Sequence, residues 1–138
     1  LKLARLYHYL YQQAGTEFTI VNSLDGYDEI SLTSEFKVLS NSEQSMYTPE
    51  QLGFERAVES DLYGGQTVAE AAAIFDSVLS DTATRPQKNA VIANAAFAIR
   101  TIDRRLSMDD AIAQARESVE SGRAQQAFRK FVKINSQS

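Results

Sequence analysis

Hydrophobic positions in the first part of the chain change their spacing twice. Between residues 3 and 14 they recur every three or four positions, which is typical of a helix with one apolar face, and Gly15 ends this pattern. Residues 18–21 are short, β-branched and apolar, which predicts a buried strand. Residues 35–40 and 45–47 alternate loosely between apolar and polar, as in a hairpin with one face in water. The pattern therefore predicts one helix followed by a few short strands.

After residue 47 the chain is helical in pattern, and it marks each helix start with a capping side chain. The capping residues are Thr48, Thr67, Thr84 and Ser107. In the first three cases a glutamine or glutamate follows three residues later, which completes a capping box. The sequence therefore predicts helices that begin at each of these four positions.

The apolar residues of these helices predict which faces are buried. After Thr67 a single apolar stripe is formed by Val68, Ala71, Ala72, Phe75, Val78 and Leu79. The next helix is apolar nearly all round between residues 90 and 99, which predicts a buried helix. The fourth turns Ala111, Ile112, Ala115 and Val119 inward and stops at Gly122. A last helix contains Ala124, Ala127, Phe128 and Phe131.

Together these patterns predict an α/β fold in one domain that spans residues 1–138. A few short strands come early, and the second half is rich in helices. Three or four short strands provide too little sheet to cover so many apolar helix faces. Two alternatives stay open: a sheet completed by sequence outside this chain, or helices that form a bundle of their own.

Composition and charge narrow the classes of function. A net charge of −4 argues against binding a nucleic-acid backbone, because such proteins present a basic face to the phosphates. The absence of cysteine excludes disulfides, thiolate zinc sites and a cysteine nucleophile, and it fits a reducing cytoplasm. No apolar run approaches the roughly 20 residues that cross a bilayer. Leu1 opens directly into a helical pattern with neither a methionine nor a capping residue, so we expect a fragment of a longer protein.

The most informative polar feature is a pair of adjacent carboxylates, Asp28 and Glu29. They lie in residues 25–31, whose sequence is DGYDEIS, after a turn and before a predicted strand. Neighbouring side chains of a regular strand point to opposite faces, whereas in an irregular loop both can converge on one ligand. Hard carboxylate oxygens suit Mg²⁺. From the residues alone, the alternative is a solvated acidic turn.

Four other residues are weaker candidates. Gly64 and Gly65 precede a helix N-terminus and could bind an anion, although such pairs more often only form the turn. Asn94 lies in the apolar third helix, where a buried amide must be hydrogen-bonded, usually to backbone rather than to a substrate. The single histidine, His8, has no partner pattern, which favours a non-catalytic role.

Taken in order, these segments resemble the anthranilate phosphoribosyltransferases. The resemblance covers almost the whole chain, and its motifs are DGYDEIS (25–31), TPEQLG (48–53), the glycine pair, NAA (94–96) and SGRA (121–124). The acidic segment is the most specific of them. There are departures: Asn22-Ser23 stands where the family often has His-Gly, Tyr27 where leucine is usual, and Glu70-Ala71 about where asparagine is common.

The resemblance implies a fold, an activity and a metal. It implies the C-terminal part of an α/β catalytic domain with a central sheet flanked by helices. Members of this family transfer the phosphoribosyl group of 5-phosphoribosyl-1-pyrophosphate to anthranilate in tryptophan biosynthesis, releasing pyrophosphate. By resemblance Asp28 and Glu29 hold Mg²⁺ at the pyrophosphate, and Glu29 touches both ions of a metal pair. In such a reaction the negative charge of the leaving pyrophosphate must be neutralised and the two reactants must be held in position. No side-chain nucleophile is required.

The resemblance also implies parts that lie before Leu1. These are the glycine-rich phosphate loop, the main anthranilate contacts and a small helical domain through which the family dimerises. We therefore expect the chain to be inactive alone, and the full-length enzyme to be a cytoplasmic homodimer that binds neither nucleic acid nor membrane. Two alternatives stay open: a non-catalytic helical interaction module, and a pyrimidine-nucleoside phosphorylase, which shares the fold but is disfavoured by Asp28 and Glu29.

Overall fold

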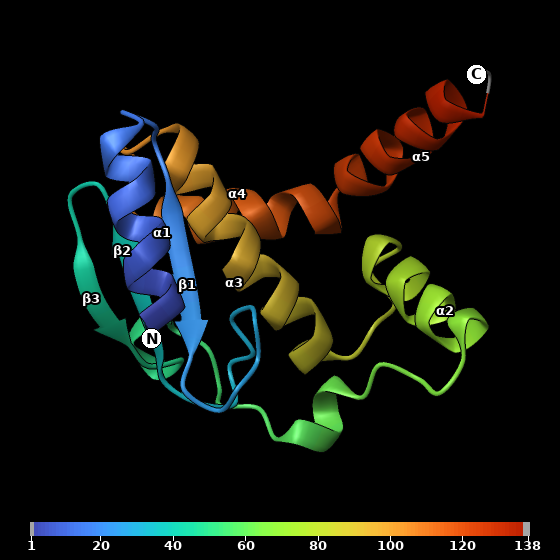
Figure 1. The fold of residues 1–138 in the computed structure, drawn as a ribbon. Helices are drawn as coiled ribbons and strands as arrows, with labels where there is room; N and C mark the ends of the chain where they lie inside the picture. Colours follow the sequence, from blue (N-terminus) through green and yellow to red (C-terminus); the bar gives the residue numbers. More distant parts are fainter. Residues whose placement is uncertain (1, 137–138) are drawn as a thin grey trace.

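Helix α1 (Lys2–Gln13) leads into a three-stranded antiparallel sheet, as the change in hydrophobic spacing predicted (Figure 1). The computed structural model describes residues 2–136. Strands β1 (Thr19–Ser23), β2 (Phe36–Ser40) and β3 (Gln44–Tyr47) pair in chain order. The predicted strands are confirmed to within two residues at each end. However, β1 is half-buried along most of its length rather than buried.

The second half of the chain is helical. Two 3₁₀ turns, η1 (Glu50–Leu52) and η2 (Glu59–Leu62), precede the helices α2 (Val68–Leu79), α3 (Arg85–Ile102), α4 (Met108–Glu120) and α5 (Arg123–Asn135). The hydroxyl of Thr67 accepts the backbone N–H of Glu70 at 3.2 Å, and that of Ser107 accepts the N–H of Asp110 at 3.0 Å. These contacts satisfy N–H groups that have no partner inside their helix, so the capping residues set the helix starts. The α/β fold class is confirmed.

The helix predicted after Thr48 is only one turn long. Its capping bonds do form, because Thr48 N–H donates to Gln51 Oε1 at 2.8 Å and Gln51 N–H donates to Thr48 Oγ1 at 3.3 Å. Gly53 then adopts the left-handed region, with φ +74°, and ends the turn. Leu52 and Phe54 on either side of it are buried, so the chain enters the core instead of continuing as a helix.

The core lies between the sheet and helices α3 and α4. Phe36, Tyr47 and Phe97 form its aromatic part, with ring centroids 5.5–5.7 Å apart. Ala93 of α3 and Ala115 of α4 are nearly inaccessible to solvent. Such small side chains allow the two helix backbones to approach closely, and dense packing of this kind holds α3 against α4.

Helices α2, α3 and α5 are less buried than their patterns predicted. In the apolar stripe of α2, Val68 is 89% exposed and Phe75 is 48% exposed, while Val78 is buried. Helix α3 is buried along one face and exposes Val91 on another. Within its described length α5 has no buried residue. These helices stay exposed because the small sheet covers one side of α3, whereas α2 and α5 lie beyond the opposite side of α3 (Figure 1). Among the described residues, no helix combines the length and the apolar character needed to span a membrane.

Candidate functional site

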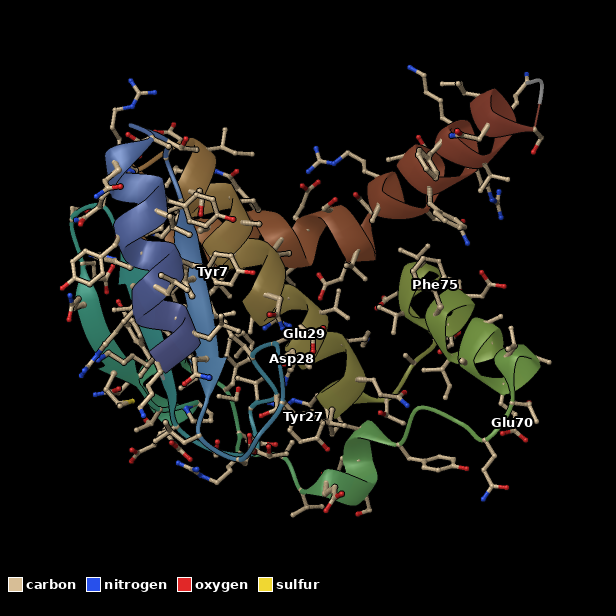
Figure 2. The ribbon with its side chains drawn as sticks, viewed as in Figure 1. Tyr7, Tyr27, Asp28, Glu29, Glu70 and Phe75 are labelled. Atoms are coloured by element: carbon tan, nitrogen blue, oxygen red, sulfur yellow. The ribbon has the colours of Figure 1, made fainter. Side chains whose placement is uncertain are left out.

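The two candidate carboxylates lie in an irregular loop between β1 and β2, residues 24–35, here called the acidic loop. Asp28 and Glu29 are both exposed. Figure 2 shows them together beside α3, with Tyr27 close by. No strand begins directly after Glu29, because the backbone there bonds to a side chain instead of to another strand. The sequence predicted that both carboxylates could bind one ligand only if the backbone here is irregular, and the backbone is irregular.

That side chain is Asn94 of α3. Its Oδ1 accepts the backbone N–H of Ile30 at 3.0 Å, and its Nδ2 donates to the backbone carbonyl of Ile30 at 2.8 Å. The same Nδ2 also donates to the carbonyl of Ala90, one turn earlier in the helix, at 2.9 Å. The expectation that this amide bonds to backbone is confirmed. Its partner lies 64 residues away in sequence, immediately after Glu29.

Other contacts fix the loop from its remaining sides. The buried hydroxyl of Ser23, the last residue of β1, donates to the backbone carbonyl of Glu29 at 2.6 Å. Ala57 N–H donates to the carbonyl of Leu32 at 3.0 Å. Ile30 and Leu32 are each 1% exposed, so they anchor the loop in the core. Asp28 and Glu29, which come just before Ile30, stay in solvent. Because of these anchors, the acidic pair stands on a restrained backbone.

Asp25, at the start of the loop, is an internal hydrogen-bond acceptor. Its carboxylate accepts from the hydroxyl of Thr33, whose oxygen also lies 2.7 Å from Ser31 Oγ. Partial burial acts to raise the pKa of Asp25, but hydrogen bonds from the Thr33 and Ser34 hydroxyls and from nearby backbone outweigh it and lower the pKa below 3.8. A lowered folded-state pKa stabilises the loop above that value, and this stabilisation is lost as the pH falls through the folded-state pKa. Asp25 therefore closes the loop rather than facing a ligand.

The donor set of the acidic pair fits a hard divalent cation. Mg²⁺ is usually held by one or two carboxylates, with water and substrate phosphates completing its octahedron. Asp28 and Glu29 supply two carboxylates that are open to solvent. Within residues 2–136 no group of three or more histidine, cysteine, aspartate or glutamate side chains could hold a metal ion. Two exposed carboxylates are too few for a closed structural metal site, and they leave room for water and phosphate oxygens around a cation.

A cavity of about 630 Å³ opens beside the acidic pair. Its walls are largely apolar side chains of α3, including Ala90, Val91 and Ala95. Glu29, Ser31 and Asn94 supply its polar edge. The acidic loop and α3 together thus present a carboxylate at the margin of an apolar hollow, an arrangement that suits a ligand with one charged and one apolar part.

The glycine pair does not share this site. Gly65 has φ +86°, and a Cβ added there would lie 2.7 Å from Glu70 Cβ, so the turn into α2 requires glycine. The N–H of Gln66, which could have served an anion, donates to Glu70 Oε2 at 2.6 Å. Figure 2 shows Glu70 at the end of α2 that is remote from Asp28 and Glu29. The structure therefore favours the turn-forming role of the pair over the anion site.

His8 packs against aromatic rings on α1 and before β1. Its ring centroid lies 5.4 Å from that of Phe18, edge to face, and 6.1 Å from that of Tyr9. A contribution to packing therefore accounts for this histidine. Ser23 and Thr33, which shape the acidic loop, carry no motif of their own, and no local pattern predicted their contacts.

Comparisons with known proteins connect this arrangement to one family. The model of the glycosyl transferase family, a/b domain, matches residues 1–125. The anthranilate phosphoribosyltransferase of Bacteroides fragilis is 56% identical over 135 residues, covering 98% of this chain and 41% of that protein. The enzyme of the same name from Cytophaga hutchinsonii is 49% identical over 133 residues, covering 96% of this chain and 40% of its own length. The chain thus spans about two fifths of the relatives it matches.

Solved structures agree with the fold. Anthranilate phosphoribosyltransferase from Thermus thermophilus superposes with a TM-score of 0.86 at 26% identity, over 96% of this chain and 40% of that one. The Saccharomyces cerevisiae enzyme in complex with PRPP and Mg has a TM-score of 0.86 at 22% identity, over 99% of this chain and 39% of that one, a likeness of fold alone. With its family model matched along residues 1–125 and its fold repeated in these structures, the chain belongs to the glycosyl transferase family, as part of its a/b domain.

Proposed function

We propose that this chain supplies the magnesium-binding part of an anthranilate phosphoribosyltransferase. The reaction transfers the phosphoribosyl group of 5-phosphoribosyl-1-pyrophosphate to anthranilate and releases pyrophosphate. The observation that carries the proposal is the pair Asp28 and Glu29, exposed on a loop whose backbone is fixed by Ser23 and Asn94. Relatives that share 56% and 49% of the sequence bear this enzyme's name, which supports the choice of substrates.

The chain's own residues have a limited task in this chemistry. Bond breaking at the ribose leaves positive charge on the sugar and negative charge on the departing pyrophosphate. A Mg²⁺ ion held by Asp28 and Glu29 would supply the positive charge that the departing phosphates require. The restrained loop keeps the two carboxylates in one place, so little reorganisation is needed when the phosphates arrive. The anthranilate amine is itself the nucleophile, so none of this chain's side chains has to form a covalent bond.

A non-catalytic interaction module accounts for the same site less well. Such a module has no use for adjacent carboxylates that stand on a loop anchored by two buried residues and two polar side chains. A solvated acidic turn would function equally well on a loosely held loop. The anchoring of the acidic loop therefore favours the enzymatic proposal.

The test requires the parts that relatives have beyond the matched region. This chain is joined to the remaining segment of the Bacteroides fragilis relative, and we call the product the joined enzyme. The formation of N-(5-phosphoribosyl)anthranilate is followed by mass spectrometry. We expect product that depends on Mg²⁺ and is lost on chelation. The relative's own matched segment, rejoined across the same boundary, controls for damage caused by the junction.

Two outcomes would overturn the proposal. One is an inactive joined enzyme beside an active control. The other is phosphorolysis of uridine or thymidine with inorganic phosphate in place of phosphoribosyl transfer, which would assign the chain to the pyrimidine-nucleoside phosphorylases. The 138-residue chain alone should form no product, because two carboxylates cannot hold both substrates.

A further inference from the structure

The peptide unit between Glu29 and Ile30 is held from two sides. Its carbonyl, which belongs to Glu29, accepts the hydroxyl of Ser23 at 2.6 Å. Its N–H, which belongs to Ile30, donates to Asn94 Oδ1 at 3.0 Å. One restraint comes from the end of β1 and the other from the middle of α3. The plane of this peptide therefore cannot rotate without breaking a hydrogen bond at one of its faces.

Asn94 binds its target as a neighbouring strand would. Two residues in an antiparallel ladder exchange N–H and carbonyl bonds in a reciprocal pair. The amide of Asn94 provides the same donor and acceptor to Ile30, at 2.8 and 3.0 Å. Its extra bond to the carbonyl of Ala90 fixes the amide's own orientation on the helix. A single helical side chain thus replaces a strand at the point where the sheet has ended.

The restraint acts directly on the acidic pair. With the peptide plane after Glu29 fixed, the direction in which the Glu29 side chain leaves the backbone is set. Asp28 follows, because it is the preceding residue on the same restrained turn. Glu29 and Asn94 also line the same cavity of about 630 Å³, so the helix and the carboxylate face one space.

We propose that Asn94 is a positioning residue for the Asp28–Glu29 metal site, acting through the backbone of Ile30 rather than through contact with the metal. This inference rests on the proposed function, since it takes the acidic pair to be a magnesium site. It assigns to Asn94 a role in metal affinity that goes beyond a share in packing.

The chain offers a matched control in Asn41. Its Oδ1 accepts the N–H of Phe18 at 3.1 Å, and its Nδ2 donates to the carbonyl of Thr16 at 2.8 Å. It therefore makes the same two kinds of bond to a different loop. The strand register pairs Thr19 with Ser40 and Ser23 with Phe36, which places Asn41 at the opposite end of the sheet from the acidic loop.

The experiment measures metal affinity rather than turnover. The joined enzyme, with 5-phosphoribosyl-1-pyrophosphate present, is titrated with MnCl₂ while free Mn²⁺ is followed by electron paramagnetic resonance against a protein-free control, and circular dichroism checks that each variant is folded. We expect Asn94→Ala to weaken Mn²⁺ binding about tenfold, the lower end of what removal of an outer-shell partner usually costs. Asn41→Ala should stay within about twofold of wild type, because its loop carries no part of the site.

A second variant keeps the test decisive if Asn94→Ala does not fold. Ser23→Ala releases the same peptide from its other side and should also weaken Mn²⁺ binding. In a chain that already carries Asp28→Asn and Glu29→Gln, neither Asn94→Ala nor Ser23→Ala should weaken Mn²⁺ binding further. If the two residues were merely structural, each change would have the same small effect on Mn²⁺ binding with and without the carboxylates.

Two results would overturn the inference, and they can be told apart. If Asn94→Ala and Ser23→Ala bind Mn²⁺ as Asn41→Ala does, while loss of the carboxylates abolishes binding, Asn94 is not a positioning residue and the proposed function stands. If wild type binds no more tightly than the variant without the two carboxylates, the magnesium site itself is wrong and the inference fails with it.

Discussion

Glu29 and Asp28 are adjacent in sequence but differ in how the backbone around them is held. The carbonyl of Glu29 accepts a hydrogen bond from Ser23, and the following N–H is bound by Asn94. Glu29 also lines the cavity beside α3. The backbone is therefore held more tightly at Glu29 than at Asp28.

We predict that Glu29→Gln harms catalysis by the joined enzyme more than Asp28→Asn does. Both changes nearly preserve size, so loss of packing does not confuse the comparison. Metal stabilisation of developing charge contributes several kcal/mol, and each ~1.4 kcal/mol lost lowers the rate tenfold. Glu29→Gln should lower kcat/KM on the order of a hundredfold, with partial rescue by excess Mg²⁺. Asp28→Asn should lose less and be rescued more fully.

Steady-state kinetics at limiting and saturating Mg²⁺ measure this difference. A solvated acidic turn predicts little effect of either change. If both variants keep rates within about threefold of wild type at limiting Mg²⁺, a loss under ~1 kcal/mol, Asp28 and Glu29 do not belong to the site.

The two glycines before α2 differ, because the backbone geometry requires glycine at Gly65 but not at Gly64. At Gly65 an added Cβ meets Glu70 Cβ at 2.7 Å and the backbone N of Ala71 at 3.1 Å, in a conformation with φ +86°. In the described part of the chain, no heavy atom lies within 4 Å of a Cβ built at Gly64.

We predict that Gly65→Ala destabilises the start of α2, whereas Gly64→Ala does not. A left-handed conformation costs a residue with a Cβ about 1–2 kcal/mol, and the clash adds to this cost. Amide hydrogen exchange in the first turn of α2 should become at least about tenfold faster, the change that ~1.4 kcal/mol produces. Unchanged protection in Gly65→Ala would show that the turn relaxes without cost.

At this scale the sequence singled out polar residues of the acidic loop and of α3 but not the connections between them. Asp28, Glu29 and Asn94 could each be selected from residue type and context. The bond that joins Asn94 to Ile30 could not, since it spans 64 residues and depends on how α3 lies across the end of β1. Ser23 was missed for the same reason, because a serine at a strand end has no local signature of the carbonyl it will meet.

Among the elements, α2 and α5 contact one another at the periphery of the molecule. Their link is the pair Phe75 and Phe128, whose ring centroids lie 4.8 Å apart in an edge-to-face contact. Phe75 remains 48% exposed and α5 buries no residue along its described length. The two helices are thus held by a small contact at the periphery.

We predict that Phe128→Ala loosens both helices, while Phe131→Ala changes little. An aromatic pair contributes about 0.5–1.5 kcal/mol beyond its buried area, and Phe131 is 62% exposed. Hydrogen exchange should become faster along α2 as well as α5 in Phe128→Ala. Acceleration restricted to α5 would show that the two helices are independent of each other.

Helix starts were predictable and helix environments were not. Thr67 and Ser107 form the bonds that their local sequence indicated, because capping involves residues three positions apart. Whether the stripe of α2 is covered depends on which surfaces surround it, and that is not a local property. The same limit explains why α3, apolar nearly all round in sequence, keeps one face open.

The whole molecule exposes much apolar surface for its size. On α1, Leu3, Leu6 and Leu10 are 61%, 54% and 50% exposed. The chain also spans about two fifths of the length of its relatives, so surfaces that are covered in those proteins can be uncovered here. The sequence anticipated this state from the small amount of sheet, and contiguous apolar patches of this kind promote association.

We predict that the isolated chain self-associates at high concentration. The pair Leu6→Glu and Leu10→Glu, one turn apart on α1, should reduce this association without unfolding the sheet, since both side chains are already half in solvent. Multi-angle light scattering across a concentration series measures it, with Lys2→Glu as the control for added charge. A wild-type chain that remains monomeric would show that its exposed leucines do not form a contact surface.

One stripe of side chains on α3, Asn94, Phe97 and Thr101, contacts the acidic loop, the aromatic core and the start of β1. The hydroxyl of Thr101 donates to Thr19 Oγ1 at 2.6 Å at the start of the strand, and Asn94 holds the loop that follows its end. One inserted residue turns a helix by about 100°, because a turn takes ~3.6 residues. An insertion or deletion between residues 94 and 101 would therefore turn Asn94 and Thr101 out of line with each other. Either the acidic loop or β1 would then lose its hydrogen bond to α3. We therefore expect length variation among relatives to fall outside this helix, in the connections at 80–84 and 103–107.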